Sequence, residues 1–158
     1  MPLGQFKKLI DNLRSFDFEK EQQEIVADNA EAITPYVLEQ LAAGKDGDGK
    51  ENTIFGRRGY SPKTVAIKEA NGEGLGRVTS RITNYMTGEF YETMFAKVEG
   101  KTFEEDSPVS YFGDITLYSS DALLEVNEEN RKDFGQKIIL PGITDRLLAK
   151  TGLLITSK

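Results

Sequence analysis

The chain has 158 residues and a formal net charge of −6, and it contains neither cysteine nor histidine. It can therefore form no disulfide, no thiolate or imidazole metal site, and no Ser-His or Cys-His nucleophile pair. An acidic balance also argues against nonspecific nucleic-acid binding, which needs a basic surface to displace counterions from phosphates. We expect no catalytic residues, no cofactor and no metal ligands.

The length suits one domain, and 38% hydrophobic content is low for that size, so some apolar surface is expected to be buried against partners. Charge alternates along the chain: residues 1–43 and 82–130 are acidic, whereas residues 44–81 and 131–158 are basic. Opposite charges could meet inside one fold, or copies could stack acidic surface against basic surface. No apolar run approaches the length needed to cross a bilayer, and the N-terminus lacks a cleavage site, so we expect a cytoplasmic protein with no membrane partner.

Helical spacing of apolar residues dominates the first third of the chain. One such set spans residues 6–13, and a second spans residues 25–41. Thr34-Pro35 interrupts the second set, where it could begin a new helix or kink a continuous one. We predict a kinked helix over about residues 18–43 that ends at Gly44.

A glycine-rich segment follows, and residues 45–76 are predicted to be mobile. Its sequence DGDG, which begins at Asp46, suggests a calcium loop, but an EF-hand starting there needs glutamate where the chain has Arg57. A turn is the better prediction. Within the segment, Ser61-Pro62 is typical of a helix start, and we predict a short helix over residues 64–70.

The sequence Gly72-Glu73-Gly74-Leu75-Gly76-Arg77 comes next. A dinucleotide-binding fingerprint needs a preceding strand and a third glycine, whereas a predicted helix precedes this stretch and Arg77 stands at the glycine's position. We predict a loop that does not bind phosphate.

The stretch NYMTGEFYETMF, residues 84–95, could be a binding site or an ordinary core beside a helix start. Thr87 is suited to cap a helix, and Glu89 would then meet the positive end of the helix dipole. We assign the stretch chiefly to core and cap, because aromatic clusters beside a helix start are usually buried. Tyr85 and Tyr91 are the candidate interface residues, since a tyrosine can bury its ring while its hydroxyl contacts a polar partner.

Alternating residues then predict strands at 95–98, 101–106 and 110–119, which would form an antiparallel meander covered by a helix. Pro141-Gly142 predicts a turn, and residues 143–153 a last amphipathic helix. The whole pattern predicts one α+β domain over residues 1–158: N-terminal helices packed with a small antiparallel sheet, and short helices near the C-terminus.

Three stretches of the chain, Tyr60–Thr64, Arg77–Thr79 and Tyr85–Tyr91, resemble small virion morphogenesis proteins of tailed bacteriophages, of the tail-completion or head-tail joining type. Those proteins similarly carry an N-terminal helix, a mobile middle segment, a Thr-Gly turn that opens a short helix, and then an antiparallel sheet. Members usually have a residue series ending in serine before the strand, where this chain has Thr93-Met94. Residues 121–158 match nothing in the family.

The resemblance implies structural work and no catalysis. Such proteins assemble as oligomeric rings that join the head to the tail or complete the tail. The implied partners are further copies of this chain and other virion proteins such as portal, adaptor or tail proteins, with no specific nucleic-acid binding. The implied location is the virion, and the host cytoplasm during assembly.

Two other functions stay open. The acidic segment 89–129 fits a small acidic binding protein that acts on a host factor, although the basic residues of 45–81 suit nucleic-acid mimicry poorly. A carboxylate-dependent hydrolase could use Glu104, Glu105, Asp106 or Asp114. That chemistry needs two acids at a set separation, one of them with a raised pKa, whereas neighbouring strand residues point to opposite faces.

Overall fold

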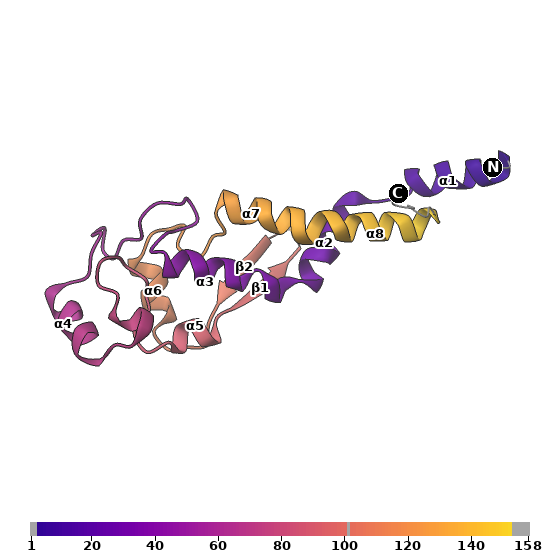
Figure 1. Ribbon diagram of the computed structural model, residues 1–158. Coiled ribbons are helices and arrows are strands. Elements are labelled where there is room, and N and C mark those ends of the chain that lie inside the picture. The colour runs from indigo at the N-terminus through magenta and orange to yellow at the C-terminus, as the bar shows by residue number, and fades with distance from the viewer. Residues whose placement is uncertain (1–2, 101, 153–158) are drawn as a thin grey trace. The chain divides into compact units, whose positions relative to one another are not determined.

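The computed structural model describes residues 3–100 and 102–152, and its helices and small antiparallel sheet confirm the α+β class (Figure 1). Contacts within the chain divide it into two compact units. The first unit is Met1–Asn29 with Asp133–Lys158, and the second unit is Ala30–Lys132. One domain over the whole length stays a prediction. Across the described residues, no helix combines the length and the apolar character that crossing a membrane requires.

The first unit is helical. It contains α1 (Leu3–Arg14), α2 (Phe18–Asp28), the π-helix η3 (Gly135–Ile139) and α8 (Leu140–Thr151). The Asp17 side chain accepts a hydrogen bond from the Lys20 amide at 3.1 Å and so fixes the start of α2. Phe16 and Ile25 are buried, and Arg146 of α8 donates to three carboxylates of α2.

The predicted kinked helix over residues 18–43 is wrong. After α2 ends, a short 3₁₀ turn, η1 (Ala30–Ala32), precedes a separate helix, α3 (Thr34–Ala42). The Asn29 side-chain amide donates to the Ile25 carbonyl at 2.8 Å, and such local bonds compete with continuation of a helix. Pro35 lies in the first turn of α3, where its missing N–H costs no helical hydrogen bond. Gly44 follows α3 at a positive φ of 71°, as predicted for its end.

The second unit packs a hairpin against η1 and α3. Strands β1 (Phe95–Glu99) and β2 (Thr102–Asp106) pair antiparallel, with Phe95 opposite Asp106. Val37 and Leu41 of α3 are fully buried at the centre of the core. The hairpin lies close to this helix, because Thr34 donates a hydrogen bond to the Glu105 carboxylate.

The third predicted strand, residues 110–119, is wrong, and so is the meander. This segment forms a helix, α6 (Phe112–Tyr118), whose last amide bond closes from Ser119 to Ile115. Phe112 and Ile115 are apolar and three positions apart, so they lie on the same face of a helix. The segment therefore fits a helix as well as it fits the alternation of a strand. Thr116 also donates its hydroxyl to the Phe112 carbonyl at 3.2 Å, inside the helix.

The predicted turn at Pro141-Gly142 is wrong as well, because both residues lie in the first turn of α8. Proline lacks an N–H and its ring clashes with the carbonyl four residues earlier, and the wider π-helical turn of η3 lies directly before it. A Cβ built on Gly142 would lie 2.9 Å from Ile25 Cδ1, so the glycine allows α8 to approach α2 closely.

Replacing Gly142 with valine is expected to lower the free energy of unfolding by about 2 kcal/mol, because overpacking a tight helix contact typically costs about 1–3 kcal/mol. Urea titration followed by circular dichroism measures the change. The matched control is Gly4→Val in α1, where an added Cβ meets no atom within 4 Å. Equal losses in both variants would show that helix propensity, and not the contact with Ile25, accounts for the effect.

The remaining elements of the second unit include α4 (Pro62–Asn71), the 3₁₀ helix η2 (Gly74–Arg77) and α5 (Glu89–Thr93), and α7 (Glu128–Phe134) begins in this unit. The start of α4 is confirmed, since Ser61 Oγ accepts from the Thr64 amide at 3.2 Å. The predicted turn at DGDG is confirmed too: Asp46 Oδ1 accepts from the amides of Asp48 and Lys50. Mobility of residues 45–76 stays a prediction.

Candidate functional site

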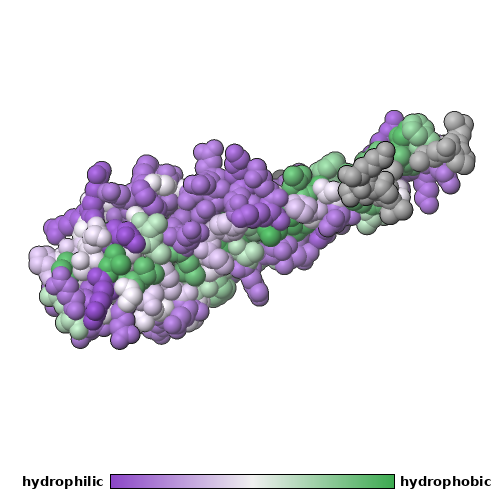
Figure 2. All heavy atoms as spheres, viewed as in Figure 1, coloured by the Kyte–Doolittle hydropathy of each residue, from purple (hydrophilic) through white to green (hydrophobic). Residues whose placement is uncertain are grey.

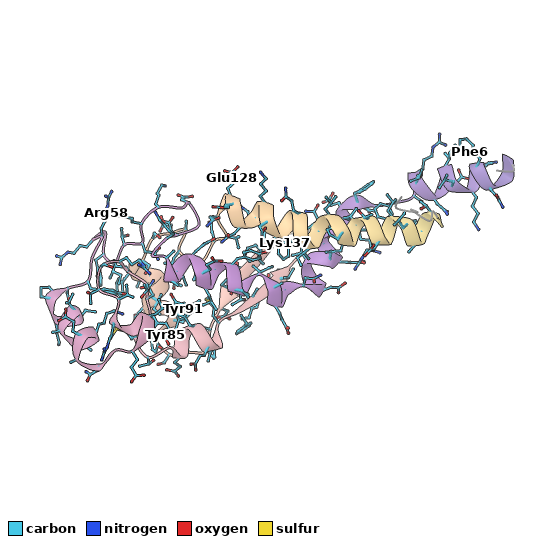
Figure 3. The ribbon with its side chains drawn as sticks, in the orientation of Figure 1. Phe6, Arg58, Tyr85, Tyr91, Glu128 and Lys137 are labelled. Carbon is cyan, nitrogen blue, oxygen red and sulfur yellow. The ribbon has the colours of Figure 1, made fainter. Side chains whose placement is uncertain are left out.

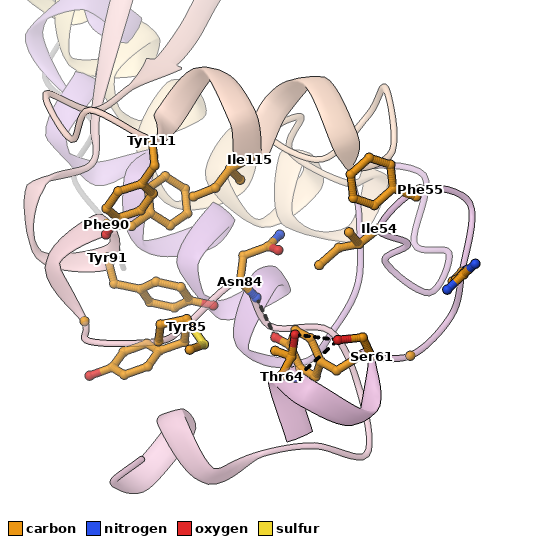
Figure 4. A pocket seen from close by; sticks show the side chains of 15 residues that line it. Ile54, Phe55, Ser61, Thr64, Asn84, Tyr85, Phe90, Tyr91, Tyr111 and Ile115 are labelled. Atoms are coloured by element: carbon orange, nitrogen blue, oxygen red, sulfur yellow. Dashed lines mark hydrogen bonds between the residues drawn. The ribbon is translucent and has the colours of Figure 1, made fainter. Parts of the chain in front are cut away.

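A cavity of about 300 Å³ lies in the second unit, where three stretches of the chain meet (Figure 4). Residues 54–64 form one wall, residues 84–91 a second, and α6 with the residue before it a third. The lining is mostly apolar and contains six aromatic residues, which are Phe55, Tyr60, Tyr85, Phe90, Tyr91 and Tyr111. The cavity is therefore suited to an apolar or aromatic group.

Both candidate interface residues lie at this cavity, next to each other (Figure 3). The rings of Tyr85 and Tyr91 meet edge to face with their centroids 4.9 Å apart. Tyr91 donates its hydroxyl to the Thr83 carbonyl at 2.6 Å. Burial, together with Tyr60 and Tyr85, raises the pKa of Tyr91, so its hydroxyl remains a neutral donor. The Tyr91 hydroxyl is thus used inside the chain, and its ring is the part that faces the cavity.

The stretch NYMTGEFYETMF divides between core and cavity. Phe90 and Met94 are buried, which confirms the assignment to core for these two, whereas Met86 and Phe95 of the same stretch are exposed. The predicted Thr87 cap is wrong: the residue before α5 is Gly88, at a positive φ of 96°, and no side chain caps the helix. A Cβ on Gly88 would lie 2.7 Å from the Tyr85 hydroxyl oxygen, so the glycine makes room for that tyrosine.

Tyr60 and Lys68 hold the second wall of the cavity in place. The Tyr60 hydroxyl accepts hydrogen bonds from the Thr83 amide at 2.9 Å and the Asn84 amide at 3.1 Å. Lys68 of α4 is 1% exposed and donates from Nζ to the Tyr85 carbonyl at 2.5 Å. The same Nζ lies 4.8 Å from the centre of the Tyr60 ring, and burial lowers the pKa of Lys68. Lys68 is thus a positioning residue for the wall.

The cavity wall also contains unfavourable backbone conformations. Within residues 3–100 and 102–152, the non-glycine residues with positive φ are Phe55 at 51° and Asn84 at 54°, and both line this cavity. That region is costly for a bulky residue such as phenylalanine. The Asn84 Nδ2 atom is buried without a hydrogen-bond partner in the described part of the chain, and Figure 4 shows the amide between Ile54 and Ile115. Strained backbone of this kind gathers at functional sites.

Exposed apolar side chains lie at the cavity edge and elsewhere on α6. Phe55 is 67% exposed and stacks on Tyr118 with ring centroids 4.3 Å apart, and Leu117 is 70% exposed. No residue of α6 is buried, although most of the helix is apolar. Figure 2 shows hydrophobic side chains gathered on one face of the second unit among hydrophilic ones. Such patches mark sites of interaction with other molecules.

Three exposed basic residues flank the first wall. They are Arg57, which is itself a lining residue, Arg58 and Lys63. The Arg58 side chain, labelled in Figure 3, makes a long ion pair of 3.9 Å with Glu51, and both side chains are well exposed. Exposed pairs of this length stabilise a fold little, so the positive charge is presented at the edge of the cavity.

The structure does not gather the candidate carboxylates at the cavity, whose lining contains no acidic residue. Glu105 is buried beside Thr34, and burial raises its pKa to about 7. Asp106 pairs with Lys97, while Asp114 is exposed on α6. Among the residues that the structure describes, no group of three acids could hold a metal ion.

Sequence reasoning gave no role at a site to six of the lining residues, which are Ile54, Phe55, Arg57, Gly59, Tyr111 and Ile115. A signal was present for the first two: Ile54-Phe55 is an apolar pair inside a polar, glycine-rich segment, where it has no evident local use. For α6 the alternating pattern pointed to a strand, so its residues could not be assigned to the cavity.

Comparison of the sequence and the fold with known proteins finds no matching family model, no matching curated protein and no matching solved structure. The function of the chain is therefore inferred from the cavity and its surroundings.

Proposed function

We propose that the chain is a structural component of a tailed phage particle, where it joins the head to the tail or completes the tail as part of an oligomeric ring. One observation carries the proposal. Tyr60–Thr64 and Tyr85–Tyr91, two of the stretches that resemble such proteins, lie far apart in the sequence and line the same cavity. The two stretches thus form one surface together, and this shared surface supports the proposal.

The chemistry of the cavity supports association over catalysis. Its lining offers aromatic rings, aliphatic side chains and hydroxyls, with one arginine and no carboxylate. Aromatic residues and arginine are enriched at protein interfaces, and a fully buried aromatic group often dominates the binding energy there. Phe55 is exposed and stacks on Tyr118, so the apolar surface extends beyond the cavity.

The partners in this proposal are further copies of the chain and the neighbouring virion proteins, such as portal, adaptor or tail proteins. Its location is the virion, and the host cytoplasm during assembly. The alternation of acidic and basic segments along the sequence supports repeated contact between copies, because opposite charges steer encounter and select partners.

Particles of the phage whose genome encodes this chain provide the test. Quantitative mass spectrometry of purified particles is expected to find the chain at a fixed number of several copies per particle. Deleting its gene is expected to leave heads and tails unjoined, or tails incomplete, in electron micrographs. Absence of the chain from purified particles, with normal particles from the deletion strain, would overturn the proposal.

A further inference from the structure

We propose that the cavity of one copy receives the Phe18 side chain of the next copy, so that Phe18 and the cavity form the repeated contact of the ring. The inference rests on the proposed function, for which it names the contact.

Three exposed phenylalanines lie outside the cavity lining: Phe6 is 54% exposed, Phe18 57% and Phe95 43%. An aromatic cavity is filled best by an aromatic ring, since offset and edge-to-face arrangements add attraction to the burial of area. Phe95 is the least exposed of the three, and Lys97 Nζ lies 5.4 Å from the centre of its ring. Phe6 and Phe18 are therefore the stronger candidates.

Charge separates these two candidates. Phe6 is followed by Lys7 and Lys8, whereas Phe18 lies between Asp17 and Glu19. The first wall of the cavity is flanked by positive charge, from Arg57 and its neighbours Arg58 and Lys63. Like charges brought together at an interface cost free energy, and opposite charges select the partner. The acidic surroundings of Phe18 match the basic edge, and those of Phe6 do not.

The position of Phe18 is also fixed before binding. It is the first residue of α2, whose start is fixed by the hydrogen bond from the Lys20 amide to Asp17. Its ring meets the buried Phe16 edge to face at 4.7 Å. A side chain ordered before binding loses less conformational entropy when it binds. A cavity of about 300 Å³ has room for one such ring, and the exposed lining residue Phe55 can pack against it.

The contact joins two different surfaces, since Phe18 belongs to the first unit and the cavity to the second. When two copies bind through unlike surfaces, one copy still has an unoccupied cavity and the other still has a free Phe18. Such an interface repeats until it closes into a ring or continues as a filament. The inferred contact therefore supplies the kind of interface that a ring requires.

Two variants remove the two sides of the contact. Phe18→Ala removes the inserted ring. Gly59→Phe is expected to block the cavity, since Gly59 is a lining residue where an added Cβ meets no atom within 4 Å. Native mass spectrometry of the full chain is expected to show each variant as a monomer at concentrations where the wild type forms rings. Loss of a dominant aromatic contact is expected to weaken neighbour binding about 30-fold or more. The matched controls, Phe6→Ala and Gly59→Ala, are expected to form rings.

Mixing the two variants is the decisive step. Gly59→Phe copies keep Phe18 and Phe18→Ala copies keep an open cavity, so an equal mixture can form one contact per pair. The mixture is expected to give a dimer of one copy of each, at twice the monomer mass and no larger. Rings formed by either variant alone, or a mixture that stays monomeric, would overturn the inference. If the wild type still forms rings in that case, the proposed function stands. A monomeric wild type that is also absent from particles would overturn both.

Discussion

Replacing Gln40 with leucine is expected to lower the free energy of unfolding by about 3 kcal/mol or more. Gln40 is 3% exposed on α3, and its side-chain amide makes three hydrogen bonds to the segment before and within α7. Its Nε2 donates to the Glu125 carbonyl at 2.8 Å, and its Oε1 accepts from the Asn127 amide at 2.7 Å and from Asn130 Nδ2 at 3.0 Å. Leucine removes all three bonds. Asn130 Nδ2 keeps its bond to the Tyr36 carbonyl at 3.2 Å, so the loss falls on the part-buried Glu125 carbonyl and Asn127 amide, and each such group left without a partner costs about 1–3 kcal/mol.

Urea titration followed by circular dichroism measures the loss. Glu39→Leu is the control, because Glu39 is exposed one position earlier on the same helix. Surface changes of this kind usually stay within about 0.5 kcal/mol. A Gln40→Leu variant as stable as the control would mean that the 125–130 segment is not held by this side chain.

Stability is expected to fall as the pH rises from about 4.5 to about 7, and Glu105→Gln is expected to abolish this component. Burial raises the pKa of Glu105 to about 7 from 4.5, against the opposing effect of the Thr34 hydroxyl. Between these values the folded chain binds more protons at this site than the unfolded chain does, so each rise in pH favours unfolding. The raised pKa corresponds to about 3 kcal/mol of stability, present below about pH 4.5 and lost above about pH 7.

The measurement is the free energy of unfolding of the wild type and of Glu105→Gln at intervals from pH 4 to pH 8. The variant is expected to be the more stable protein at pH 8, because it buries no charge. Glu104→Gln, at the exposed neighbouring position on β2, is the control and is expected to follow the wild type. Parallel profiles for the wild type and Glu105→Gln would show that Glu105 titrates normally in the folded chain.

The sequence predicted the parts of the fold that depend on local chemistry. The start of α4 follows from Ser61-Pro62, and the turn at residues 46–50 follows from an aspartate that can bind two amides of its own loop. The hairpin follows from two short alternating runs around Gly100. Each of these features is determined within a few residues.

The errors fall where packing decides between local alternatives. Residues 110–119 alternate well enough for a strand, but Phe112 and Ile115 also share a helical face. In α6 the Phe112 ring lies 6.0 Å from that of Phe90, and Ile115 lines the cavity. Pro141-Gly142 is typical of a turn, yet Gly142 lies inside α8, where Ile25 packs against its bare backbone. A local sequence pattern does not show which distant residue will pack against a given glycine.

Only part of the candidate site could be predicted, because some of its residues are close in sequence and others meet only through packing. Tyr85 and Tyr91 stand in one conspicuous aromatic stretch, so the sequence indicated them. Phe55 and Tyr111 reach the cavity from loops and helices distant in sequence, and only the folded second unit brings them together. Asn84 likewise lines the cavity with a positive φ of 54°, in a segment whose amides donate to the Tyr60 hydroxyl.

Association between copies of the chain is the central claim, and sedimentation velocity over a wide range of concentrations tests it most directly. The account predicts that monomers give way to one defined oligomer as concentration rises. It also predicts that higher salt weakens this association, since opposite charges contribute to it. Monomers at every concentration and every ionic strength would contradict the account.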